Sequence, residues 1–263
     1  MGGATKSRTA AVRAAALKMQ SGGMSGGKKS GNTADKLNAM SKMSSDERAD
    51  VLQAAFNVAL SPGVYNQGIT QQLVEAQGLN AKPALVSDKE FDAIASKNGI
   101  TIYRTVKNTE SGITGKELLD NTLKGDINSL GSGIYGAGHY FATNYSESVL
   151  YGDDKKGQGT VRATFNKKDV KIIEMNKLQK MYADEVNSSS KLHDVCDKID
   201  RHCRTLTNSA YGNRKDILSA YALTKGYDAI YVQSRDYYTF MTRDKLVFSS
   251  YIKDTANDYG DKW

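Results

Sequence analysis

The sequence predicts an α+β protein in which a mostly antiparallel sheet packs against helices. Helix start signals and amphipathic segments occupy residues 33–98. Alternating, β-branched segments begin at residue 101, and three further strand-like segments follow residue 229. Because 39% of the 263 residues are hydrophobic, the chain can bury one sizeable core.

The first of these regions predicts helices with defined ends. Ser-x-x-Glu capping boxes open helices at residues 44–47 and 87–90. The first helix is expected over about 46–60, where Ser-Pro-Gly stops it, and another over 70–77, where a glycine stops it. The third ends at Asn-Gly, so residues 33–98 are predicted to form a small helical lead-in.

The remainder of the chain mixes strands and helices. Helices are expected over 114–124 and 145–151, and two or three more within 176–226. Strands are expected over residues 101–107, 139–143, 160–165, 171–175, 229–233, 237–241 and 246–251.

Composition excludes several classes of protein. The mean hydropathy is −0.53 and no apolar run reaches the roughly 20 residues of a membrane span, so no membrane association is expected. Two cysteines exclude a disulfide scaffold. The spacing of His193, Cys196, His202 and Cys203 matches no common zinc motif, and a helix would split them over two faces, so no metal site is expected.

Most of the net charge of +7 lies at the N-terminus. We expect residues 1–32 to form a flexible, glycine-rich basic arm that contacts nucleic acid or an acidic protein or virion surface, although a solubilising tail is the plain alternative. Arg13 interrupts the only apolar stretch of the arm, so no signal peptide is expected and the protein should be cytoplasmic or virion-associated. The basic residues among positions 1–34, which contain no acid, are Lys6, Arg8, Arg13, Lys18, Lys28 and Lys29.

A glycine cluster at 131–138 leads into the segment Gly138-His139-Tyr140-Phe141-Ala142, which Ser148 and Tyr151 follow. This pattern resembles the second NAD-binding block of the ADP-ribosyltransferase superfamily. In the poly(ADP-ribose) polymerase branch that block reads Gly-x-Gly-Ile-Tyr-Phe-Ala and then Ser-x-x-Tyr. The spacing from Tyr140 to Ser148 to Tyr151 is that of this branch.

The resemblance implies a role for each of these side chains. Tyr140 would line the nicotinamide ribose, Ser148 would hydrogen-bond the nicotinamide amide, and Tyr151 would stack on the nicotinamide ring. Gly138 would let the backbone approach the ligand. Thr143 would be a remnant of the Ser-Thr-Ser strand that toxin-type members carry.

The strand residues Tyr103-Arg104-Thr105 match the first block of the family. By resemblance, Arg104 corresponds to the arginine with which toxin-type members hold the phosphate and ribose of NAD. Thr105 would offer its backbone to the nicotinamide amide. The chain therefore combines features of two branches.

Active members of the family usually place a glutamate on a late strand, where it stabilises the cationic ribose as nicotinamide leaves. The last glutamate of this chain is Glu185. An ungapped match places Tyr237 at the position of the glutamate, and a shift by one residue places Asp236 there. Gln233 is a weaker candidate, and Asp236 is the residue that we expect to act as the third catalytic group beside Arg104 and Tyr140.

The resemblance implies an ADP-ribosyltransferase-like domain over 99–256, with a split antiparallel sheet, between the lead-in at 33–98 and a tail at 257–263. The expected function is NAD-dependent mono-ADP-ribosylation of a protein or nucleic acid, as in bacterial toxins and bacteriophage proteins. NAD would be the substrate and no metal would be needed. The alternatives are a catalytically degenerate fold that serves as a virion structural or interaction protein, and a nucleic-acid-binding protein that acts through its basic arm.

Overall fold

The structure is a computed structural model that describes residues 32–60, 68–109, 112–124, 131–133, 136–152, 158–206 and 216–254. The side chains of 131–133 and 202–206 are not part of this description. The predicted tail at 257–263, and all but the last residue of the predicted basic arm at 1–32, lie outside the described residues.

The predicted helices are confirmed, with ends that differ by a few residues at most. Ser44 and Ser87 accept hydrogen bonds from Glu47 and Glu90 backbone N–H groups and complete the two capping boxes. One further helix, α2, was not predicted; the Asn32 side chain caps it. The helices are α2 (Thr33–Ser41), α3 (Ser45–Ala59), α4 (Ile69–Ala76), α5 (Asp88–Asn98), α6 (Gly115–Lys124), α7 (Tyr145–Val149), α8 (Met175–Ser188), α9 (Ser190–Leu206) and α10 (Asp216–Thr224).

The seven predicted strands are also present, and with β1, β3 and β10 they form one mixed sheet. Its strand order is β1-β9-β5-β2-β4-β8-β7-β6, while β10 pairs with β5 and β3 pairs with β4. The described pairs are antiparallel except at the two ends of the path, where β1–β9 and β6–β7 are parallel. The strands are β1 (Ala84–Val86), β2 (Thr101–Val106), β3 (Gly131–Gly133), β4 (Gly136–Ala142), β5 (Gly159–Thr164), β6 (Ile172–Glu174), β7 (Ala229–Val232), β8 (Tyr237–Phe240), β9 (Val247–Ser249) and β10 (Lys253–Asp254).

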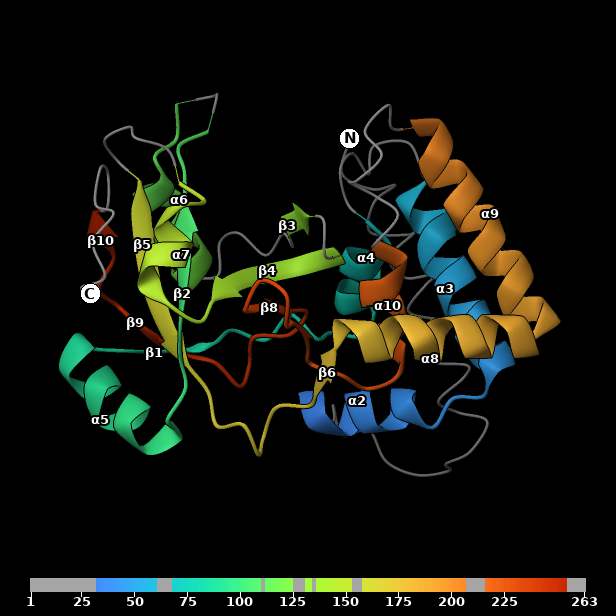
Figure 1. Cartoon of the computed structure of the whole chain (residues 1–263), viewed down its shortest axis with the longest axis horizontal. Coiled ribbons are helices and arrows are strands. Elements are labelled where there is room, and N and C mark those ends of the chain that lie inside the picture. Colours follow the sequence, from blue (N-terminus) through green and yellow to red (C-terminus); the bar gives the residue numbers. More distant parts are fainter. Residues whose placement is uncertain are drawn as a thin grey trace.

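The sheet forks between β2 and β4. These strands share a single register pair, Tyr103 with Ala142, whereas β2 and β5 are paired along their whole length. Figure 1 shows the consequence: β2 and β5 stand upright, and β4 runs across the molecule toward the helices. The sheet is therefore continuous along its path, but its two halves diverge beyond Tyr103.

Each face of the inner half, β4–β8–β7, borders a different hydrophobic core. Consecutive residues of one strand enter different cores: Phe141 and Tyr238 belong to one, Ala142 and Tyr237 to the other. Helices α2, α3, α4, α8, α9 and α10 build the second core and gather on one side of the molecule in Figure 1. Helices α2, α3 and α4 of the predicted lead-in thus pack together with α8, α9 and α10 from the second half of the chain.

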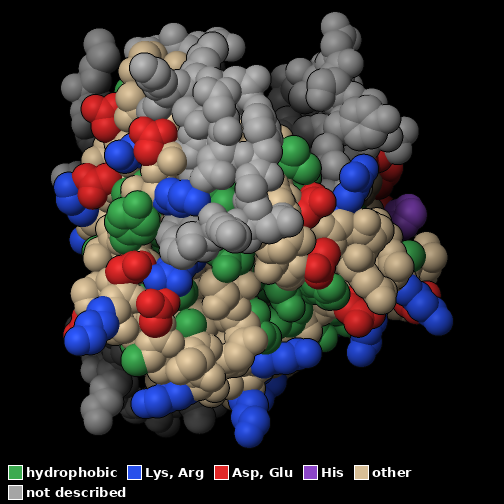
Figure 2. Space-filling model, turned by 60° about the vertical axis from the view of Figure 1, so that its left-hand side comes forward, with side chains coloured by type: hydrophobic (Ala, Val, Ile, Leu, Met, Phe, Trp, Pro, Cys, Tyr) green, Lys and Arg blue, Asp and Glu red, His purple; other side chains and the backbone are tan. Residues whose placement is uncertain are grey.

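The described surface carries no dominant charge on the face shown in Figure 2, where basic and acidic side chains are interspersed. No helix of the described part is long and apolar enough to cross a membrane. Within the described residues, no three His, Cys, Asp or Glu side chains are grouped as metal ligands would be. Helix α9 forms over the four histidines and cysteines considered above, and Cys196 is buried as a free thiol.

Candidate functional site

Three blocks that lie far apart in the sequence meet on neighbouring strands. The first block is on β2, the second on β4 and α7, and the third on β7 and β8, and the order β2-β4-β8-β7 places them side by side. Helix α7 packs against both β2 and β4. The sequence signals alone do not contain this order, because it depends on pairing between distant strands.

The register decides which side chains share a face of the sheet. Side chains alternate along a strand, and cross-strand partners point to the same side. Tyr103 pairs with Ala142, and Tyr140 pairs with Thr239. Thr105, Tyr140 and Tyr237 therefore belong to one face, which we call the α7 face because the side chains of α7 contact it. Arg104 and His139 belong to the opposite face.

On the α7 face, two of the predicted nicotinamide-binding residues are in contact. Ser148 Oγ lies 2.9 Å from Thr105 Oγ1, which is also 2.6 Å from Thr160 Oγ1. Ser148 and Thr160 are buried. Three hydroxyl groups from β2, α7 and β5 thus form a connected group, which can both donate and accept hydrogen bonds.

Helix α7 owes its position to a side-chain cap and an aromatic contact. The Asn144 side chain accepts the Glu147 backbone N–H at 2.8 Å, as an N-cap residue does. The Tyr145 ring packs edge-on against Tyr103 of β2, with ring centroids 5.9 Å apart. Both contacts fix the helix, and with it Ser148, over β2.

Tyr151, the predicted stacking residue, packs against Tyr237. The ring centroids are 5.0 Å apart and the rings are nearly perpendicular, while Tyr151 remains 56% exposed. The Tyr237 hydroxyl donates to the Glu147 carbonyl at 3.3 Å. Burial, followed by the hydrogen bond with Tyr151 and the charge of Glu147, raises the pKa of Tyr237. Tyr237, which the ungapped match aligned with a glutamate, is therefore a neutral phenol in contact with Tyr151.

Asp236 points away from these residues. It ends the β7–β8 turn with φ 54°, and its carboxylate accepts hydrogen bonds from the hydroxyl groups of Thr143 and Tyr231. Tyr231 pairs with Tyr238 and so belongs to the face opposite Tyr237. The structure brings the two predicted residues Thr143 and Asp236 together, but it does not bring Asp236 to the Ser148 hydroxyl or to the Tyr151 ring.

Arg104 lies at the fork, on the face opposite Ser148. Its Nη1 is 2.8 Å from His139 Nδ1, and its guanidinium lies 6.0 Å from the centroid of the Phe141 ring. Burial, together with the charge of Arg243, lowers the pKa of Arg104 to about 10. Burial and the two arginines lower the pKa of His139 well below its usual range, so His139 is neutral and Nδ1 can accept. The sequence analysis gave His139 no role, and nothing in the sequence indicated this contact.

Gly138 and Tyr140 have local structural roles. A side chain on Gly138 would meet Thr239 Cγ2 at 2.5 Å and the Phe240 carbonyl oxygen at 2.9 Å, so the close approach of β4 and β8 requires glycine there. The Tyr140 hydroxyl donates to the Gly136 carbonyl and is half-buried on the α7 face.

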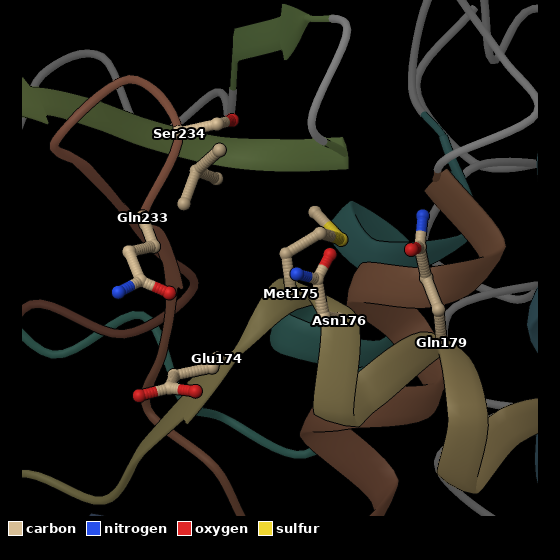
Figure 3. A pocket seen from close by; sticks show the side chains of 7 residues that line it. Glu174, Met175, Asn176, Gln179, Gln233 and Ser234 are labelled. Atoms are coloured by element: carbon tan, nitrogen blue, oxygen red, sulfur yellow. The ribbon is translucent and has the colours of Figure 1, made fainter.

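A separate cavity of about 330 Å³ opens between the start of α8 and the end of β7 (Figure 3). Glu174 and Gln233 flank one side, and Asn176 and Gln179 of α8 the other. Gln233, the weaker candidate for the third block, is therefore part of this cavity. Arg104, Tyr140, Ser148 and Tyr151 do not line it. The lining residues are Glu174, Met175, Asn176, Gln179, Val232, Gln233 and Ser234.

Comparisons of the chain with protein-family models, with curated proteins and with solved structures find no match in any of the three.

Proposed function

We propose that this protein binds NAD across the fork of its sheet and transfers the ADP-ribose part to a protein or nucleic-acid acceptor. One observation supports this proposal above the others. The buried Ser148 hydroxyl contacts the Thr105 hydroxyl of β2, which lies 43 residues earlier in the chain, and the exposed Tyr151 ring packs on Tyr237 of the same face.

This group of side chains suits a nicotinamide ring. A flat aromatic ligand needs an aromatic surface and a few fixed polar groups. Tyr151 offers the surface, the Ser148 hydroxyl can donate to the amide carbonyl, and the Thr105 backbone can pair with the amide. Tyr140, on the same face, would border the attached ribose.

Arg104 would serve the diphosphate of NAD. A guanidinium has five N–H donors, and His139 receives one of them. Because β2 and β4 share only the register pair of Tyr103 with Ala142, Arg104 lies where the two halves of the sheet begin to diverge. A dinucleotide that extends from the α7 face past this point would bring its negative charges toward Arg104.

The reaction needs little covalent chemistry from the protein. The bond between ribose C1′ and the nicotinamide nitrogen breaks, and its electron pair leaves with nicotinamide, which becomes neutral. A nucleophile of the acceptor then bonds to C1′ and loses its proton. The protein has to bind NAD, exclude water and stabilise the positive charge that develops on the ribose.

A second function is favoured by Tyr237. It occupies the position at which active relatives of such a fold would carry a carboxylate, and its hydroxyl is buried and held by Glu147. A chain that binds NAD but does not cleave it would act as an interaction or virion structural protein with a retained pocket. The proposed transferase and this alternative differ in turnover, not in binding.

The test is nicotinamide release from NAD by the full chain, together with NAD binding by calorimetry. We expect Tyr151→Ala to weaken NAD binding about tenfold or more, since base-stacking aromatic contacts contribute about 1–3 kcal/mol. Tyr251→Ala is the matched control, because Tyr251 is 51% exposed and lies outside the site. Ser148→Ala should weaken binding as well, whereas Ser146→Ala on the same helix should not.

The outcomes separate the functions. Turnover by wild type supports the transferase. Binding without turnover supports the retained pocket, and the absence of both would refute any role for NAD.

A further inference from the structure

Among the described helices, four carry a glutamate at the third helical position, and Glu147 of α7 is the one whose carboxylate makes no capping bond. In α3, α5 and α6 the glutamate at the third helical position accepts a hydrogen bond from the backbone N–H of the N-cap residue. In α7, Asn144 caps the helix with its own side chain, and no return bond from Glu147 exists among the described residues. The Glu147 side chain is exposed and forms no ion pair or hydrogen bond within the described part of the chain.

Glu147 adjoins two residues of the proposed nicotinamide site, Ser148 and Tyr237. Glu147 directly precedes Ser148 in α7, and Tyr151 follows in the turn that ends this helix, where its N–H donates to the Ser148 carbonyl. The Tyr237 hydroxyl donates to the Glu147 carbonyl, and the Glu147 charge acts on that hydroxyl. Glu147 thus adjoins the residue that stands at the expected position of the catalytic glutamate.

We infer that Glu147 is a catalytic residue of this site and supplies, from α7, the carboxylate that the late strand lacks. This inference rests on the proposed function. With nicotinamide against Tyr151, the Glu147 carboxylate would lie near the ribose and stabilise the cation that forms when the C1′–nitrogen bond breaks. The electron pair of that bond leaves with nicotinamide, and the acceptor's proton passes to Glu147 or to water as the new bond to C1′ forms. No metal or redox partner is needed.

The experiment compares wild type with Glu147→Gln, using Glu117→Gln as the matched control. We expect Glu147→Gln to lower kcat for nicotinamide release about 100-fold or more and to leave the Kd for NAD within about threefold, because the carboxylate acts on the transition state. Glu147→Asp should recover part of the loss. Glu117→Gln removes a glutamate from the same helical position of α6, where it is engaged in a capping box. It should affect stability and leave kcat unchanged.

Three results would overturn the inference, and they are distinguishable. If wild type releases nicotinamide and Glu147→Gln does so equally fast, another group stabilises the ribose and only the role of Glu147 is wrong. If wild type releases no nicotinamide, the proposed transferase function is itself wrong. A parallel fall of kcat and of NAD affinity in Glu147→Gln, without recovery in Glu147→Asp, would show that the residue only holds α7 in place.

Discussion

At the scale of single residues, Asp236 combines a left-handed backbone with two hydrogen bonds. Its φ of 54° is unfavourable for a residue with a Cβ atom, although aspartate tolerates it better than most. The bonds from Thr143 and Tyr231 hold the side chain in place. Asp236, which was expected to be the third catalytic group, therefore has a structural role in the β7–β8 turn.

We expect Asp236→Ala to be about 1 kcal/mol less stable than Asp236→Gly. Both variants lose the two hydrogen bonds, but only glycine adopts a positive φ without a steric cost. Urea unfolding followed by circular dichroism measures the difference. The same pair of substitutions at Ser234, in the same turn but without a positive φ, should not favour glycine. Equal stability of the two Asp236 variants would mean that the backbone relaxes away from this conformation.

At the scale of elements, Glu185 of α8 joins three helices. Its carboxylate accepts hydrogen bonds from Ser45 of α3 and from Tyr221 of α10, and it forms ion pairs with Arg48 and Lys225. Arg48 is only 1% exposed. A buried charge that loses its partner is costly, so this cluster depends on Glu185.

We expect Glu185→Gln to destabilise the protein by about 3 kcal/mol at pH 7. Burial alone would raise the pKa of Glu185, but the bonds from Lys225, Tyr221 and Ser45 and the charge of Arg48 outweigh it and lower the pKa. A lowered folded-state pKa gives stability that is present above the unfolded pKa, about 4.3, and lost as the pH falls through the folded value.

The difference between wild type and Glu185→Gln should therefore shrink in acid, as urea unfolding at pH 7 and below pH 4 would show. Asp184→Asn, at an exposed neighbouring position, is the control. A difference that does not change with pH would assign the loss to packing instead of charge.

Helix α7 is a short element on which the proposed site depends. Asn144→Ala removes the N-cap of this five-residue helix, which costs about 1 kcal/mol. We expect NAD affinity to fall several-fold, because Ser148 and Tyr151 lose their fixed position. Calorimetry measures the affinity. Asn32→Ala removes the equivalent cap of α2, far along the chain from the site, and should lower stability without changing the affinity. Equal affinities in both variants would contradict the role of α7.

At the scale of the whole molecule, sequence reasoning predicted the elements well and their assembly poorly. Capping boxes and alternation are local signals, so α3, α5, β2 and β8 were found with nearly correct ends. The pairing of β1 with β9 joins Ala84 to Val247, and the contact of Tyr151 with Tyr237 joins two distant blocks. Such contacts depend on the register of several strands at once. The predicted roles of the site residues came from the resemblance, and their chemistry stays a prediction.

The two hydrophobic cores should unfold together, because β4, β8 and β7 lie between them and contribute side chains to both. Leu73 of α4 and Leu246 beside β9 are fully buried in different cores. Replacing either by alanine should cost about 2–5 kcal/mol.

If the sheet couples the cores, each variant shifts one common transition in urea, seen alike by circular dichroism and by tyrosine fluorescence. If the helices from residues 33–98 formed an independent unit, Leu73→Ala would produce an early separate transition and leave the Leu246 core at its wild-type midpoint. We expect the common transition, since neighbouring residues such as Tyr237 and Tyr238 belong to different cores. Unfolding of either core would therefore disrupt strands that the other core also needs.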